Sequence, residues 1–178
     1  MKNIKIQIVE DNLMVLQSLK HLLSSIGKFD IVATSINLEQ AVIDAKQLKP
    51  NIILMDVNMG SKTCYNCLEE ILAVQKETKV IALTSSEDIL VIQKMLKIGA
   101  SGYLTKSVSK ETLIEAINEV LDGKEFICEE VKDVYFKNFI INDFDETIPE
   151  TNLDNLRKRV DERINHILEY TESVKIVS

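Results

Sequence analysis

The sequence lacks the features that mark secreted, membrane-spanning and repeat proteins. None of its apolar runs approaches the roughly 18 to 20 residues that a membrane-spanning helix needs. Its first residues lack the long apolar core of a signal peptide, and its three cysteines are an odd number, which argues against a disulfide framework. It has no tandem repeat and no low-complexity tract. We therefore expect a cytoplasmic protein without a membrane partner.

The chain also lacks an excess of positive charge. Its formal net charge of −7 argues against broad, nonspecific binding to nucleic acids. Of its 178 residues, 46% are hydrophobic and 28% are charged, which is the composition of an ordinary globular protein. This length suits one well-packed domain with an appendage.

Five short apolar segments alternate with stretches in which apolar residues recur at helical spacing. The predicted strands are residues 4–9, 31–33, 52–56, 80–83 and 102–104. Strands that alternate with helices form parallel sheets, because parallel strands need crossover connections. We predict an α/β fold over residues 1–122, in which five helices flank a five-stranded, parallel, doubly wound sheet of order 2-1-3-4-5.

Polar side chains follow four of these strands where each strand ends. They are Glu10 and Asp11, Asp56, Thr84, and Lys106. The carboxyl ends of neighbouring parallel strands meet at one edge of a sheet, so we expect these side chains to converge. Three carboxylates placed together repel one another unless a cation lies among them, and hard oxygen ligands suit Mg²⁺.

This set of side chains has the components of a phosphoryl-transfer site. Asp56 could act as a nucleophile toward a phosphoryl group and form an acyl phosphate. Lys106 supplies a positive charge for one phosphoryl oxygen, and the Thr84 hydroxyl supplies a donor for another. Taken singly, each residue is more often a cap or a solvated surface group; their occurrence at successive strand ends favours a site.

Four segments carry a resemblance to a known family. They are residues 8–12 (IVEDN), 54–59 (LMDVNM), 82–85 (ALTS) and 99–106 (GASGYLTK). With these residues at these spacings, the first 122 residues resemble the receiver domain of a two-component response regulator. The resemblance implies that Asp56 accepts a phosphoryl group from the phosphohistidine of a histidine kinase or phosphotransfer protein.

The resemblance also implies a magnesium site and a switch. Mg²⁺ would be bound by Asp11, Asp56 and the backbone carbonyl of Asn58, with Glu10 acting through water. Lys106 would pair with the phosphoaspartate.

Two further residues would respond to phosphorylation. Thr84 would move to hydrogen-bond the phosphoryl group, and Tyr103 would swing inward behind it. The alternative for Tyr103 is an ordinary half-buried aromatic residue of a strand.

Three positions depart from the family pattern. Gly60 stands where the family usually has proline, Cys64 where it has glycine, and Ser107 where many members have proline. Glycine is more permissive than proline, so the shape and rigidity of the loop after Asp56 are open.

Cys64 and Cys67 form a Cys-x-x-Cys pair. A zinc site would need two more ligands, and the other candidates, Cys128, His21 and His166, are scattered along the chain. A thioredoxin-like role would need the pair next to the first strand of such a fold. We interpret these cysteines as structural or incidental.

The last 56 residues are predicted to carry the output function of the protein, its interaction with other molecules. Residues 123–150 are interpreted as a linker with a helix, because 138–156 contain five acids, one proline and no lysine or arginine. Residues 151–178 are predicted to form an amphipathic helix, with an apolar residue at every seventh position: Leu153, Val160, Ile167 and Val174. This helix could form a homodimer, bind a partner protein or fold back onto the receiver.

Other functions remain as alternatives. The receiver segment most resembles regulators that carry a four-helix DNA-binding domain, but the tail shows no helix-turn-helix pattern. Its basic patch, residues 157–159 and Arg163, is interleaved with acids, so DNA binding is the less favoured output. A phosphatase with an aspartate nucleophile would want a second carboxylate at Asn58. We expect no enzymatic activity beyond phosphorylation from small donors and self-dephosphorylation.

Overall fold

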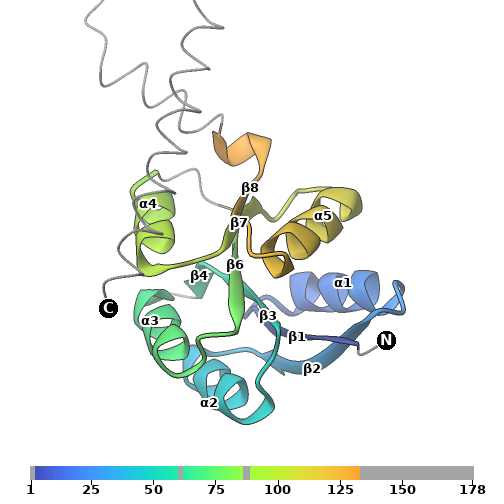
Figure 1. Ribbon diagram of the computed structural model, residues 1–178, viewed down its shortest axis with the longest axis horizontal. Helices are drawn as coiled ribbons and strands as arrows, with labels where there is room; N and C mark the ends of the chain where they lie inside the picture. The colour runs from blue at the N-terminus through green and yellow to red at the C-terminus, as the bar shows by residue number, and fades with distance from the viewer. Residues whose placement is uncertain (1–2, 60–61, 86–88, 133–178) are drawn as a thin grey trace, which may run out of the picture.

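The computed structural model describes residues 3–59, 62–85 and 89–132 (Figure 1). One parallel sheet lies at the centre, with α1 and α5 on one face and α2, α3 and α4 on the other. The helices are α1 (Leu13–Ser24), α2 (Leu38–Leu48), α3 (Tyr65–Val74), α4 (Ile89–Ile98) and α5 (Lys110–Leu121). The predicted α/β fold, with a parallel sheet between helices, is confirmed.

Within the described residues the sheet has six strands, so the prediction of five strands was wrong. Its order is β2-β1-β3-β6-β7-β8, which adds β8 beyond the five predicted strands. The strands are β1 (Ile4–Val9), β2 (Phe29–Ser35), β3 (Ile52–Asp56), β6 (Lys79–Thr84), β7 (Gly102–Thr105) and β8 (Phe126–Ile127). With only two residues, β8 is too short to show a periodic pattern, which is why the sequence did not reveal it.

The core lies on both faces of the central strand. All five residues of β3 are buried, and Ile52, Ile53, Leu54 and Met55 have no exposed surface. A strand that helices cover on both faces is apolar at every position, which explains the unbroken apolar run before Asp56. β3 pairs with β1 on one side and β6 on the other, so Asp56 lies at the centre of the sheet edge.

Three helices begin at side-chain caps. The side chain of Asn12 accepts hydrogen bonds from the backbone of α1, Asn37 from Gln40 in α2, and Ser109 from Thr112 in α5. Such caps satisfy amide groups that have no partner within the helix. They fix where each helix begins, and therefore how the preceding loop crosses the carboxyl edge of the sheet.

The loop between β3 and α3 contains a small antiparallel ladder that the sequence did not reveal. β4 (Asn58–Met59) pairs with β5 (Lys62–Thr63). Met59 is buried in the hydrophobic core, with 6% of its surface exposed. Backbone pairing therefore joins the two described arms of this loop.

Several predictions fall on residues outside the described ranges. Gly60, the later part of the predicted linker and the predicted helix 151–178 all lie there. Among the described residues, no helix is long and apolar enough to cross a bilayer.

Candidate functional site

The predicted site residues lie at the carboxyl edge of four adjacent strands. Glu10 follows β1, Asp56 ends β3, Thr84 ends β6, and Lys106 follows β7. The neighbours β1, β3, β6 and β7 run parallel, so these residues come to the same edge. Loops as well as strand ends contribute, because Asp11 lies in the turn before α1.

Three carboxylates form the acidic part of the site. One oxygen from each of Glu10, Asp11 and Asp56 lies within 4.8 Å of the others. Glu10 and Asp56 are buried, with 0% and 2% of their surfaces exposed, whereas Asp11 is exposed. Buried carboxylates beside a solvent-facing one fit a hard divalent cation that keeps part of its water shell, as Mg²⁺ does.

Lys106 contacts both buried carboxylates. Its Nζ lies 2.9 Å from Oδ2 of Asp56 and 2.8 Å from Oε2 of Glu10. Burial by itself would lower the pKa of Lys106, but the hydrogen bonds to Glu10 and Asp56 and the negative charges of both carboxylates together outweigh it, and the pKa is raised. The ammonium group is therefore held charged at the position where negative charge is concentrated.

Several effects of opposite sign act on the pKa of Glu10. Its burial raises the pKa of its carboxyl above the ordinary value, the hydrogen bond from Lys106 lowers it, and the charge of Asp56 raises it further. The net shift is upward. A cation near Glu10 and Asp56 would relieve the repulsion between them, which is a further reason why this donor set fits a metal ion.

Backbone amides orient the two buried carboxylates. Asn58 N donates to Asp56 Oδ1 at 3.1 Å, and Asn12 N donates to Glu10 Oε1 at 3.1 Å. One oxygen of Asp56 is therefore held by the backbone and the other by Lys106. The structure places Asn58 next to Asp56, while the role of its carbonyl as a ligand stays a prediction.

Thr84 ends β6, the neighbour of β3, and Tyr103 lies on the next strand, β7; both residues are fully buried. The backbone carbonyl of Thr84 accepts a hydrogen bond of 2.7 Å from Lys106 N, which ties the ends of β6 and β7 together. With no exposed surface, Tyr103 is more deeply placed than the half-buried aromatic residue considered as an alternative. The switch roles of both residues stay predictions.

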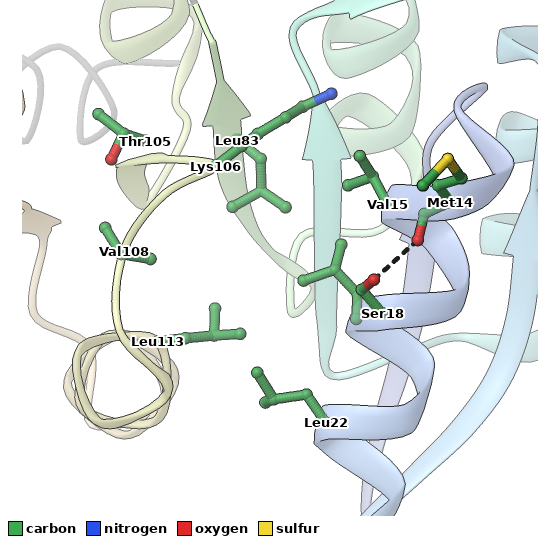
Figure 2. A pocket seen from close by; sticks show the side chains of 10 residues that line it. Met14, Val15, Ser18, Leu22, Leu83, Thr105, Lys106, Val108 and Leu113 are labelled. Atoms are coloured by element: carbon green, nitrogen blue, oxygen red, sulfur yellow. Dashed lines mark hydrogen bonds between the residues drawn. The ribbon is translucent and has the colours of Figure 1, made fainter.

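An apolar pocket beside the site was not foreseen from the sequence. It has a volume of about 370 Å³ and lies between α1, the loop after β7, and α5 (Figure 2). It is lined by Met14, Val15, Ser18, Leu19, Leu22, Leu83, Thr105, Lys106, Val108 and Leu113. The available signal was Met14, an apolar residue of α1 that lines the pocket and has 81% of its surface exposed.

The two cysteines after the site point to different neighbours. Cys64 Sγ lies 3.6 Å from Met95 Sδ in α4, and Cys67 Sγ lies 3.7 Å from the carbonyl oxygen of Leu38 in α2. Burial raises the pKa of each thiol to about 12. Neutral thiols that diverge in this way are poor zinc ligands and poor nucleophiles, which supports a structural role.

Comparison with known proteins gives the family. The model of the response regulator receiver domain matches residues 6–118. The transcriptional regulatory protein LnrK of Bacillus subtilis is 36% identical over 120 residues, covering 67% of this chain and 54% of LnrK. The response regulator GacA of Pseudomonas protegens is 28% identical over 137 residues, covering 76% of this chain and 64% of GacA.

A solved structure shows the same fold. A LuxR-family two-component response regulator from Aurantimonas superposes with a TM-score of 0.71 at 20% identity, covering 78% of this chain and 99% of that one. The chain thus matches 54% and 64% of the lengths of its two curated relatives. The family model spans residues 6–118, and the structure brings the three acids and Lys106 together at one edge of the sheet. The chain belongs to the response regulator receiver domain family of two-component signal transduction.

Proposed function

We propose that this chain accepts a phosphoryl group on Asp56 from a histidine kinase or phosphotransfer protein. The observation that carries this proposal is the contact of 2.9 Å between Lys106 Nζ and Asp56 Oδ2 inside a cluster of three carboxylates. A buried carboxylate with a fixed counter-ion, open to solvent on the Asp11 side, has the charge and the access that phosphoryl transfer requires.

The chemistry is an in-line displacement at phosphorus. An oxygen of the Asp56 carboxylate forms a bond to phosphorus while the bond between phosphorus and the donor histidine nitrogen breaks. The electron pair of that bond returns to the imidazole, which then takes up a proton from water. Lys106 remains next to the acceptor, where it offsets the negative charge that the phosphoryl oxygens bring.

The residues that would hold Mg²⁺ are Asp11, Asp56 and the backbone carbonyl of Asn58, with Glu10 acting through water. When bound, the ion neutralises charge on the carboxylates and on the phosphoryl oxygens. The chain's own part is to hold the carboxylates in place: backbone amides fix Glu10 and Asp56, and Lys106 fixes the space between them.

Phosphorylation would be read out by Thr84 and Tyr103. The hydroxyl of Thr84 would hydrogen-bond a phosphoryl oxygen, and Tyr103 would move behind it. Both residues belong to strands that adjoin the site, β6 and β7, and the backbone of Thr84 is already bound to that of Lys106. A local change of charge at Asp56 would thus affect the positions of both β6 and β7.

The output is proposed to be homodimerisation or binding of a partner protein through residues 151–178. We propose a receiver over residues 1–122 in a cytoplasmic protein that has no enzymatic activity beyond phosphorylation and dephosphorylation of its own aspartate. DNA binding is the second candidate output, favoured by one observation, namely that several relatives are named transcriptional regulators.

Incubation with acetyl phosphate and Mg²⁺, followed by intact-mass measurement, tests the proposal. The unaltered chain and the control Asp30→Asn, an exposed carboxylate on β2, should gain one phosphoryl group, whereas Asp56→Asn should gain none. No gain in the unaltered chain, or an equal gain in Asp56→Asn, would overturn the proposal. Light scattering on the same samples tests dimerisation, and a salt-dependent DNA shift assay tests the second output.

A further inference from the structure

We propose that residues 126–131 form a latch on the outer edge of β7, and that phosphorylation of Asp56 loosens it. The inference rests on the proposed function, because it concerns what the phosphorylated site does to the rest of the chain. It assigns a role to β8, the strand that the sequence did not predict, and it involves only described residues.

The latch is held by a very short backbone pairing. Gly102 pairs with Phe126, and Tyr103 pairs with Ile127, in parallel register. On either side, Phe126 N donates to the Ser101 carbonyl at 3.2 Å, and Cys128 N donates to the Tyr103 carbonyl at 3.1 Å. Two paired residues make this the weakest joint of the main sheet, because each of its other strand pairs spans at least four.

Apolar anchors complete the latch. Ile127, Cys128 and Val131 are 7%, 2% and 1% exposed and belong to the hydrophobic core, whereas the intervening Glu129 and Glu130 are exposed. The segment therefore lays one face on the domain and turns the other to solvent. Figure 1 shows it at the sheet edge, beyond β7 and next to α5, with a helical turn after β8.

A close backbone approach makes the pairing sensitive to β7. A Cβ added at Gly102 would lie 3.3 Å from the Phe126 carbonyl oxygen and 3.2 Å from Cγ1 of Ile81. Gly102 thus lies tightly between β6 and β8. A shift of β7 toward β8 would press on the Phe126 carbonyl, because close-packed interiors transmit strain to their neighbours.

The other end of β7 leads to Lys106, the lysine that contacts the phosphorylation site on β3. β7 is only four residues long, and Lys106 follows it directly, with its ammonium group on Asp56 and Glu10. A phosphoryl group on Asp56 adds negative charge where Lys106 now bridges two carboxylates, so the lysine must redistribute its contacts. Any displacement of Lys106 therefore begins only four residues along the chain from Gly102.

Tyr103 links the two ends of this path. Its carbonyl holds Cys128 N, and its fully buried side chain is the one predicted to reorient. Packed interiors change between discrete arrangements and do not deform gradually, so a new position of Tyr103 affects the backbone that carries β8. The chain continues from Lys132 into residues 133–178, so the latch sets where that segment leaves the receiver.

Amide hydrogen exchange on the full chain, resolved to single amides, tests the inference. With acetyl phosphate and Mg²⁺, exchange at Phe126 and Cys128 should become several-fold faster, while amides in β1 and β3 keep their rates. Asp56→Asn should show no such change. Mass spectrometry of the same samples reports phosphorylation, so no mass gain defeats the proposed function, whereas a mass gain with unchanged exchange at Phe126 and Cys128 defeats only the latch.

A pair of variants within one helical turn tests the anchors. Val131→Ala should speed exchange at Phe126 and Cys128 several-fold without phosphorylation, because it removes a buried contact. Glu130→Ala, an exposed neighbour, should not. Both variants should gain a phosphoryl group on Asp56 as the unaltered chain does. Equal exchange rates at Phe126 and Cys128 in the two variants would show that Val131 does not stabilise the pairing of β8, and would overturn the latch.

Discussion

Two sets of ionisable side chains lie near the loop after β3. One set is charged and ion-paired, and the other is neutral. Glu10, Asp56 and Lys106 form ion pairs of 2.8 and 2.9 Å at the sheet edge. Cys64 and Cys67, a few residues further along the chain, are buried without a counter-ion, and the pKa of each thiol is raised to about 12. Burial penalises the charged form in both places.

The difference between the two sets is the counter-ion. Lys106 compensates the carboxylates, so charge remains available for chemistry at the site. Around the thiols the structure provides Met95, which is uncharged, and the carbonyl of Leu38, so neutral sulfur is favoured. A Cys-x-x-Cys pattern or an acidic pair in a sequence therefore says little about chemistry until its neighbours in space are known.

The largest expected effect comes from removing the counter-ion. Lys106→Met keeps the apolar stem but leaves Glu10 and Asp56 facing each other without compensation, which should lower the free energy of unfolding by about 2 kcal/mol. Mg²⁺ should restore part of the loss, because it supplies positive charge at the same place. Urea denaturation with and without Mg²⁺ measures both effects.

The matched control for this experiment is Lys46→Met. Lys46 forms an ion pair of 2.7 Å with Glu70, but both side chains are about half exposed, so solvent screens the interaction and no measurable loss is expected. Equal losses in the two variants would show that burial at the site contributes nothing to the lysine's role.

A smaller effect is expected from the thiols. Cys64→Ala removes a buried sulfur next to Met95 and should cost about 1 kcal/mol of unfolding free energy, while phosphorylation of Asp56 is retained. Val74→Ala, at the exposed end of α3, is the control and should cost less than about 0.5 kcal/mol. Loss of phosphorylation in Cys64→Ala would contradict the separation of the two sets.

The smallest effect concerns alkaline pH. In the unfolded chain the two thiols lose their protons near pH 9, whereas in the folded chain their pKa is about 12. Between these values the unfolded state holds fewer protons, so stability should fall as pH rises. Denaturation midpoints measured from pH 8 to 9, where the unfolded thiols begin to ionise, should fall less steeply in the double variant Cys64→Ala/Cys67→Ala. Identical slopes would show that the thiols ionise freely in the folded protein.

The predictable parts of the fold were those with a strong local signal. The unbroken apolar run at 52–55 indicated a strand covered on both faces, and polar caps such as Asn12 and Asn37 marked helix starts. The end of α2 carried a weaker signal, because its C-cap is Lys49, with a positive φ of 49°, where glycine is the usual residue.

The parts that escaped prediction depend on partners distant in sequence. β8 is defined only by its pairing with β7, and β4 and β5 only by pairing with each other. The position of each site residue could be foreseen from strand ends, but the contact of Lys106 with Glu10, 96 residues away, needs coordinates. The apolar pocket likewise arises only when α1 and α5 come together.

The ladder of β4 and β5 has a consequence for how this loop can vary. Asn58 pairs with Thr63 and Met59 with Lys62, so the course of the chain after Asp56 is specified by backbone bonds and not by the ring of a proline. Backbone bonds are indifferent to most side chains but depend on register. In descendants of this sequence, substitutions in the loop that keep the buried Met59 should be tolerated, whereas the insertion or deletion of a single residue should not.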